Sequence, residues 1–474
     1  MESFAFGTRR RSFDEERSSS STNNTQGPAA ITANDASEAV INVATEKRRM
    51  EKVPLTIRED EKTKGHFDPR VVSVGPYHHG KEKLEMAERI KPIVAQLFVS
   101  SSGRDMAEFR RKALEIVDDA RNYYLEGSTN KYSDEEFAEM ILLDGLLVLA
   151  IFESITSNDR EWGGTIPDVF KKHLGAHATY LVFTDILFLL ENQLPFHVLE
   201  SLMSLKSDGS ELLETMDKIW DLVKSRGSSR KYKKKLDNKR TSRKKPLHTL
   251  EYFWLEVNGL NQPNHPLKTN TPSIDRNLVK PDYMGSSYSF RSISELKAKG
   301  IHARRSTSYP SRAFSFKSFF FFGVLEIPLL ILDPQFIVYI SNQVAFESTP
   351  NNVNNLPTMV YINLMKSLIN SPEDVKELRS RNILFSTYNS VSDEEVVKLL
   401  SSITTFGMED FRIYDEVKER IQEHYNSKAK TWIAELIHNY FSSPWTFIAF
   451  FATTSLVVLS FLQTFFTMFP PKCK

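Results

Sequence analysis

Two adjacent histidines, His78 and His79, lie in the sequence Gly-Pro-Tyr-His-His-Gly that runs from Gly75 to Gly80. An imidazole can ligate a metal or act as a general base near neutral pH. The glycines and Pro76 indicate a turn that would hold both rings in fixed positions. Adjacent side chains on a turn usually point apart, however, and no Cys or acidic residue stands at metal-ligand spacing nearby, so no metal site is expected here.

A second pair, His173 and His177, has the four-residue spacing that places two imidazoles on one face of a helix. Gly175 weakens that helix, and the glutamate of the zinc-protease motif is absent. We therefore expect no metal at this pair.

Three carboxylates, Asp144, Asp185 and Glu191, occur within strongly apolar stretches. If they were buried together, their pKa values would rise, as general acid catalysis requires. Buried acids more often pair with an arginine or cap a helix end, and Glu191 stands where a helix must stop before Pro195. We expect structural roles, with general acid–base catalysis as the alternative.

Other signatures of catalysis are missing from the sequence. It contains no glycine-rich phosphate loop and no Gly-x-Ser-x-Gly nucleophile motif, and its single cysteine, Cys473, follows a long apolar run. The sequence therefore predicts no catalytic residue, no metal and no cofactor. A cysteine next to a membrane can be S-acylated, which makes Cys473 a candidate for that modification.

Between Lys224 and Lys245 there are twelve Lys or Arg and one acid, Asp237, so this segment carries +11 and the remainder of the chain about −10. Three interpretations stay open: contact with anionic lipid, contact with nucleic acid, and a solvated insertion. A membrane anchor favours lipid over nucleic acid. The candidate lipid contacts are Lys231, Lys233, Lys234, Lys235, Arg240, Lys244 and Lys245.

The elements that must position these residues are mainly helices. Four serines stand three residues before an acid, the spacing of a capping box in which each side chain binds the other residue's backbone N–H. The four pairs are Ser133 with Glu136, Ser292 with Glu295, Ser371 with Asp374, and Ser392 with Glu395.

The apolar pattern adds further elements to these helix starts. Helices from Phe137 and from Tyr180 are apolar nearly all round, which is typical of a central core helix. Residues 313–333 are rich in Phe, Ile, Leu and Val around Gly323, which predicts a small β-hairpin or meander. Apolar residues recur four or seven apart from 411 to 441, which predicts one long amphipathic helix.

Residues 445–469 contain no charged side chain and predict a single transmembrane helix. As a helix, the segment from Thr446 would extend about 36 Å, which is enough for the ~30 Å hydrocarbon core of a bilayer. Trp445 and Phe469 would lie at the two interfaces, with Phe447 and Ile448 in the first turns.

The chain thus divides into a disordered polar tail at 1–36, a mainly helical body at 37–441 and a C-terminal membrane anchor at 442–474. A disordered basic insertion at about 224–291 interrupts the body around a short apolar helix, Leu247 to Val257. No secretory leader is visible at the N-terminus, and the apolar segment follows the body in the chain. We therefore expect a single-pass protein whose body faces the cytosol.

Six motifs stand in a fixed order along the chain: Ser73 to Gly80 with Leu84, Glu88 and Lys91; Glu139 to Gly145; Leu189 to Phe196; Gly323 to Asp333 with Ala345 to Glu347; Ser367 to Val375 with Ser392 to Val396; and Tyr440 to Trp445. In this order they resemble one family of plant proteins, the "domain of unknown function 247", and the likeness covers about residues 50 to 469. Leu146 departs from the family, which often has Cys there, so the body lacks a buried thiol.

This resemblance implies a membrane-associated plant protein without an established activity, in a family with some members linked to recognition in self-incompatibility. It supplies no catalytic residues. The sequence therefore favours a non-enzymatic recognition, signalling or scaffold protein that binds the lipid bilayer and another protein. The alternatives are an enzyme that uses the Gly75–Gly80 turn and the buried acids, and a nucleic-acid binder that uses the basic loop.

Overall fold

Serine caps begin the helices where the sequence predicts them. In the computed structural model, full capping boxes form at Ser133, Ser371 and Ser392. They start α7 (Asp134–Thr156), α16 (Pro372–Ser380) and α17 (Asp393–Ser402). Ser292 caps α13 (Ile293–Ala298) by accepting from the N–H of Glu295. The prediction of a mainly helical body is confirmed.

The structure describes most of the chain from Arg48 onward, and every structural statement below concerns these residues. The described ranges are 48–157, 160–206, 211–225, 244–260, 291–306, 314–320, 322–333, 335–352, 355–386, 391–405, 414–427 and 444–469. The predicted polar tail at 1–36 and Cys473 lie outside them, as do Lys231, Lys233, Lys234, Lys235 and Arg240.

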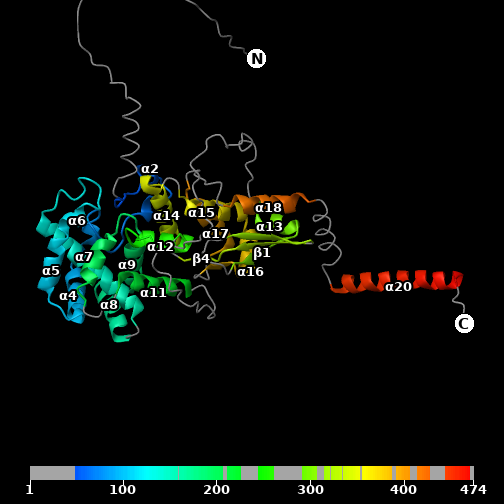
Figure 1. Ribbon diagram of the computed structural model, residues 1–474, viewed down its shortest axis with the longest axis horizontal. Helices are drawn as coiled ribbons and strands as arrows, with labels where there is room; N and C mark the ends of the chain where they lie inside the picture. Colours follow the sequence, from blue (N-terminus) through cyan, green and yellow to red (C-terminus); the bar gives the residue numbers. More distant parts are fainter. Residues whose placement is uncertain are drawn as a thin grey trace, which may run out of the picture. The chain divides into compact units, whose positions relative to one another are not determined.

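A first core forms around α7, whose side chains beyond the first turn are apolar on nearly every face. Helices α4, α5, α8, α10 and α11 all pack against it (Figure 1). Gly145 permits the close approach of α10, because a Cβ at this position would lie 2.4 Å from Leu202 Cδ1. The bounds are α4 (Lys91–Ser102), α5 (Met106–Glu115), α8 (Arg160–Leu174), α10 (Phe196–Met203) and α11 (Leu212–Ser225).

The strands belong to a second core. β3 (Gly323–Ile327) lies between β1 (Ile301–Arg305), to which it is parallel, and β2 (Ser315–Ser318), to which it is antiparallel. The predicted hairpin at 313–333 is therefore confirmed in β2 and β3. A separate parallel pair joins β4 (Leu330–Leu332) to β5 (Leu384–Ser386).

Helices α13, α16 and α17 surround these strands together with α14 (Phe336–Glu347) and α15 (Pro357–Leu368). A third cluster includes Phe67, Trp254 and Phe346, and it brings α14 together with α12 (Thr249–Asn258). Both α12 and α14 pack against α9 (Ala176–Phe188). The basic insertion expected at about 224–291 thus contains a buried helix. The shorter elements are α2 (Leu55–Arg58), η1 (Lys64–His66), η2 (Glu82–Leu84), α3 (Glu85–Glu88), α6 (Val117–Arg121) and η5 (Pro350–Asn352).

The last helix before α20 that the described ranges contain, α18 (Asp415–Asn426), packs against β2. The prediction of one continuous helix from 411 to 441 is wrong, because Ser427 takes an extended conformation with ψ 104° and ends α18. Asn426 and Ser427 are both residues whose side chains compete with helical hydrogen bonding. The apolar segment forms α20 (Pro444–Met468), and residues 428–443 before it lie outside the described ranges.

Candidate functional site

The segment from Arg70 to Gly75, which leads into the two-histidine turn and has no regular secondary structure, is bound by side chains instead of by a neighbouring strand. Asp185 Oδ2 accepts from the N–H groups of Arg70, Val71 and Val72 at 2.9, 2.7 and 3.2 Å. Burial raises the pKa of Asp185 to about 6, although these N–H donors act in the opposite direction. Asp185 therefore serves as a backbone clamp.

Asn192 and Asp144 continue the same role along the segment. Asn192 Oδ1 accepts from Val74 N–H at 2.7 Å, and its Nδ2 donates to Val72 O at 3.0 Å. Asp144 Oδ2 accepts from Gly75 N–H at 2.8 Å. Because a buried backbone group without a partner is costly, these polar side chains satisfy a stretch of chain that no sheet covers.

A buried lysine, Lys91, pairs with Asp144 next to the turn. We name Lys91, Asp144, Glu88 and Ser73 the first cluster. Lys91 Nζ also contacts Glu88 Oε1 at 2.7 Å and Ser73 Oγ at 3.2 Å. Burial alone would lower the pKa of Lys91, but the charges of Asp144 and Glu88 raise it overall. The ammonium group is therefore charged and held by two carboxylates, an arrangement that is costly to break from one side.

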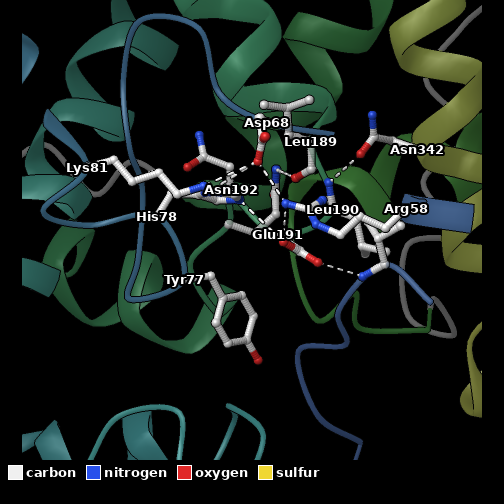
Figure 2. A network of polar contacts seen from close by, with 12 residues as sticks. Arg58, Asp68, Tyr77, His78, Lys81, Leu189, Leu190, Glu191, Asn192 and Asn342 are labelled. Carbon is white, nitrogen blue, oxygen red and sulfur yellow. Dashed lines mark hydrogen bonds and ion pairs between the residues drawn. The ribbon is translucent and has the colours of Figure 1, made fainter. Parts of the chain in front are cut away.

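His78 lies at the centre of a second cluster (Figure 2). Its ring is buried, with Nδ1 2.7 Å from Lys81 Nζ and Nε2 3.4 Å from Glu191 Oε2. Burial lowers the pKa of His78 even though Glu191 acts to raise it. Since the ammonium group of Lys81 can only donate, we assign a neutral imidazole that accepts at Nδ1 and directs its Nε2–H toward Glu191.

Glu191 connects this histidine to the start of the described chain. Its Oε1 accepts from Val53 N–H at 2.8 Å, and its Oε2 lies 3.3 Å from Arg58 Nη2. Burial would raise the pKa of Glu191, but His78, Arg58 and the Val53 N–H together lower it. The predicted pairing of a buried acid with an arginine is confirmed for this residue.

The second cluster reaches solvent at Asp68. Its Oδ1 accepts from Arg58 Nη2 at 2.7 Å and from Lys81 Nζ at 3.3 Å, and the side chain is partly exposed. Figure 2 shows Asp68 and Lys81 on one side of His78 and Glu191 on the other. The polar chain thus runs from the surface through the imidazole to a buried carboxylate.

His79, the neighbour of His78, belongs to the first cluster. Its Nδ1 is 3.8 Å from Glu88 Oε2, and its ring meets Tyr132 edge-on with 5.8 Å between centroids. The two imidazoles therefore contact different carboxylates. His78, His79, Asp144 and Glu191 all surround the turn, but they divide into two separate networks.

The hydroxyl groups of Tyr77 and Ser73, within the segment that carries the histidines, bind other groups. Tyr77 Oη donates to Met50 O at 2.6 Å and accepts from Leu125 N–H at 3.3 Å, and burial raises the pKa of Tyr77 to about 12. Ser73 Oγ donates to Glu88. Neither oxygen is a nucleophile directed at His78, so the arrangement positions the chain and does not assemble a hydrolytic dyad.

The other histidine pair does not share a helix face. Helix α8 ends at Leu174 and α9 begins at Ala176, because Gly175 between them has φ +84°. Within the described ranges, no group of three or more His, Cys, Asp or Glu side chains could hold a metal ion.

Several members of the two clusters were not among the candidates from the sequence. Arg58, Asp68 and Lys81 lie on the surface of the chain segments that meet here, and nothing in their local pattern distinguishes them from solvated charges. Lys91 could have been found, since it is a lone cation that begins an apolar helix three residues after Glu88.

Two residues of the basic loop fall within the described ranges. Lys244 Nζ lies 3.3 Å from Glu251 Oε1, and Lys245 pairs with Glu200. Both lysine side chains are more than half exposed. These pairs fix the end of the loop on the body and leave the cations accessible.

The predicted span forms a helix whose described side chains lie outside every core. Residues Ile448–Met468 are long and apolar enough to cross a membrane, and none of this stretch is buried within the protein. Trp445 and Thr446 near its start and Phe469 after its end are exposed as well. Phe447 lies in the same helix.

Comparison with known proteins gives the same relatives as the motifs. A family described as "Plant protein of unknown function" (DUF247) matches residues 50–459. The UPF0481 protein At3g47200 of Arabidopsis thaliana is 28% identical over 431 residues, which cover 84% of this chain and 82% of that protein. The putative UPF0481 protein At3g02645 of the same plant is 25% identical over 209 residues, 44% of this chain and 39% of its own. No solved structure matches.

Proposed function

Because this chain belongs to the plant protein family DUF247, whose function is unknown, we propose a role from its own residues: a membrane-anchored recognition or scaffold protein without catalytic activity. In this proposal α20 crosses a bilayer, and the helical body binds another protein beside it on the cytosolic side. Of the three readings of the basic loop, we propose the lipid contact.

The observation that carries the proposal is the exposed apolar surface of α20. Fourteen large apolar side chains from Trp445 to Phe469 are more than a third exposed. Burying one such side chain is worth roughly 1.5–3 kcal/mol, so leaving all of them in water is strongly unfavourable. A bilayer supplies the missing apolar surroundings.

The hydroxyl groups of α20 support the same reading. The side chains of Thr453, Thr454, Thr464 and Thr467 donate to the carbonyl four residues earlier, at 2.7, 2.8, 2.9 and 2.6 Å. A hydroxyl in hydrocarbon has no water to bind, so an internal partner is required there. In water these bonds would be optional.

The two clusters around the turn support the absence of catalysis. Asp144, Asp185 and Glu191 bind backbone N–H groups, and His78 faces Glu191 and Lys81. The geometry uses these groups to hold the Arg70–Gly80 segment in place. We propose that this segment, fixed so firmly, presents the body's surface to a protein partner.

Proximity labelling tests both halves of the proposal. The full chain carries a biotin ligase on its N-terminus, and the span variant L456R/L459R is compared with L114R, which adds a charge at an exposed site on α5. Each arginine at the centre of a span costs about 2.5–3.5 kcal/mol on insertion scales. We expect the span variant alone to leave the alkaline-washed membrane pellet and to lose the labelled partners.

Two results would contradict the proposal. Recovery of the unaltered chain in the alkaline supernatant would refute the membrane anchor. An identical set of labelled proteins for the unaltered chain and the span variant would refute recognition of a partner at the membrane.

A further inference from the structure

The connection between β2 and β3 has four consecutive phenylalanines in its sequence, residues 319–322, and we give the name Phe turn to its described residues, Phe319, Phe320 and Phe322. Ser318 pairs with Gly323 in the strand register, and Phe319 N–H donates to Phe322 O at 2.8 Å, so the connection is tight. Tight hairpin turns favour Gly, Asn and Asp because of their backbone conformations. Turn formation therefore does not explain the phenylalanines at these positions.

The Phe turn contributes little to the core. Phe319, Phe320 and Phe322 are 47%, 75% and 40% exposed, whereas Phe316 on the adjoining strand is 3% exposed within the second core. The rings of Phe319 and Phe322 stack with 4.9 Å between centroids and form a small apolar surface at the end of the hairpin. Exposed phenylalanines in a turn conflict both with the residue preferences of turns and with solubility, and such a local conflict indicates a functional role.

The end of α18 lies beside the Phe turn. Ser318 Oγ and His424 Nδ1 are 2.8 Å apart, and the His424 ring meets Phe316 edge-on at 5.7 Å. The guanidinium carbon of Arg291 lies over the Tyr425 ring, 4.2 Å from the ring centroid. These contacts fix the last turn of α18 on the sheet (Figure 1), so the chain departs toward α20 from a point next to the exposed rings.

Cations accompany the rings. Lys317 directly precedes the Ser318–Gly323 pair; its side chain is exposed, and its Nζ lies 3.8 Å from Glu326 Oε1. The backbone next to Lys299 reaches the same end of the sheet, since Gly323 N–H donates to Gly300 O at 2.9 Å, and Lys299 Nζ lies 5.7 Å from the centroid of the Tyr425 ring. Exposed aromatic rings beside cations suit a membrane surface, where the rings enter the interface and anionic headgroups attract the cations.

We propose that the Phe turn is a second membrane contact, in which its rings enter the headgroup region of the bilayer that α20 crosses and Lys317 faces anionic headgroups. This inference rests on the proposed function, because it needs the anchor to bring the body to that bilayer. Its position beside the exit of α18 and its cations favour lipid over a protein partner. Together, anchor and turn would fix the orientation of the body on the membrane.

Spin labels in the full chain test the contact. In a C473S background, single cysteines replace Phe320, Leu459 on α20 or Leu114 on α5, all exposed positions. The labelled proteins are reconstituted into phosphatidylcholine vesicles that contain phosphatidylserine. Power saturation then compares collisions with molecular oxygen, which concentrates in lipid, against a water-soluble nickel chelate.

We expect label 320 to favour oxygen over nickel several-fold more than label 114, and to approach label 459. Adding K317E should reduce that ratio in vesicles with phosphatidylserine and leave it unchanged in phosphatidylcholine alone. If label 320 matches label 114 while label 459 is in lipid, the contact is refuted and the anchor stands.

The remaining outcomes are also decisive. Accessibility of label 459 to nickel would refute the anchor itself, and the Phe-turn contact with it. Shielding of label 320 from both reagents would mean that protein covers the rings, either a second copy or a partner, and would overturn the lipid contact.

Discussion

Glu347, at the end of α14, is a buried carboxyl that accepts hydrogen bonds from three N–H groups. Its Oε1 accepts from Trp254 Nε1 at 2.7 Å and from Thr358 N–H at 2.6 Å, and its Oε2 accepts from Met359 N–H at 2.9 Å. Burial raises the pKa of Glu347 to about 7 in spite of these donors. The folded protein therefore binds a proton here that the unfolded chain releases near pH 4.5.

A raised carboxyl pKa makes a stability contribution that is complete below the unfolded pKa and is lost as the pH rises through the folded pKa. We expect the unfolding free energy of E347Q, relative to the unaltered protein, to rise by on the order of 2 kcal/mol between about pH 5 and 8. Denaturant titration of the full chain in detergent, followed by tryptophan fluorescence, measures it.

The control for this measurement is E126Q, which makes the same change from carboxyl to amide at an exposed glutamate. Burial lowers the pKa of several histidines, including His66 and His248, which gives the opposite pH dependence, but this contribution is common to all variants and cancels. A pH-independent difference for E347Q would show that the three N–H donors keep Glu347 ionised.

At the scale of elements, two glycines bracket the histidine turn. Gly75 and Gly80 have φ of +75° and +83°, a region that residues with a Cβ rarely enter. A Cβ at Gly75 would lie 2.8 Å from Gln193 O and 3.0 Å from Tyr124 Oη, whereas nothing lies within 4 Å at Gly80. A residue with a Cβ would be strained at either position, but only at Gly75 would its Cβ also clash with neighbouring atoms.

The pair provides a matched comparison. We expect G75A to lower the unfolding free energy by about 2–4 kcal/mol, since strain and a clash with backbone add, and G80A by about 1 kcal/mol from strain alone. Chemical denaturation of both variants in detergent measures the difference. Equal losses would mean that the Gln193 carbonyl moves aside at little cost.

Local signals predicted the helices well, because a serine cap and an apolar period act within a few residues of each other. The hairpin of β2 and β3 followed from its apolar runs. β1 and β5 did not, since β1 is short and polar and its partner β3 comes after another strand in the chain. The break of α18 at Ser427 was outweighed in the sequence by apolar spacing that continues beyond it.

The sequence predicted that the buried acids bind other groups of the protein, but it did not predict which groups they bind. A structural role for the buried acids follows from the cost of burying a charge alone. Which group each acid binds depends on segments that are distant in sequence: Asp185 clamps Arg70 to Val72, and Asp144 pairs with Lys91 instead of an arginine. Backbone N–H groups carry no sequence signal, so a clamp of this type is invisible before folding.

At the scale of the whole molecule, α14 belongs to more than one core. Tyr339 packs against both the first and the second core, and Phe346 lies in the third cluster. Asn342 Oδ1 accepts from Leu190 N–H at 2.9 Å, and its Nδ2 donates to His66 O at 2.8 Å. Opening one core would therefore leave buried polar groups of α14 without partners.

We expect amides in α7 and α15 to exchange with the same opening free energy in the unaltered chain. N342A should lower the opening free energy of α15 by about 1–3 kcal/mol and separate it from that of α7, because it orphans Leu190 N–H and His66 O. Hydrogen exchange with mass spectrometry on the full chain in detergent measures both helices. N130A, at an exposed asparagine, is the control, and independent opening in the unaltered chain would contradict the coupling.

The distance between α18 and α20 has a consequence for any partner. Residues 427–443 separate the two helices, and even fully extended this stretch reaches at most about 60 Å. An anchored body is therefore confined to a thin layer above the bilayer, where a partner in the same membrane meets it at an effective concentration that short tethers raise to about the millimolar range. Complexes too weak to survive dilution in detergent would be largely occupied within that layer.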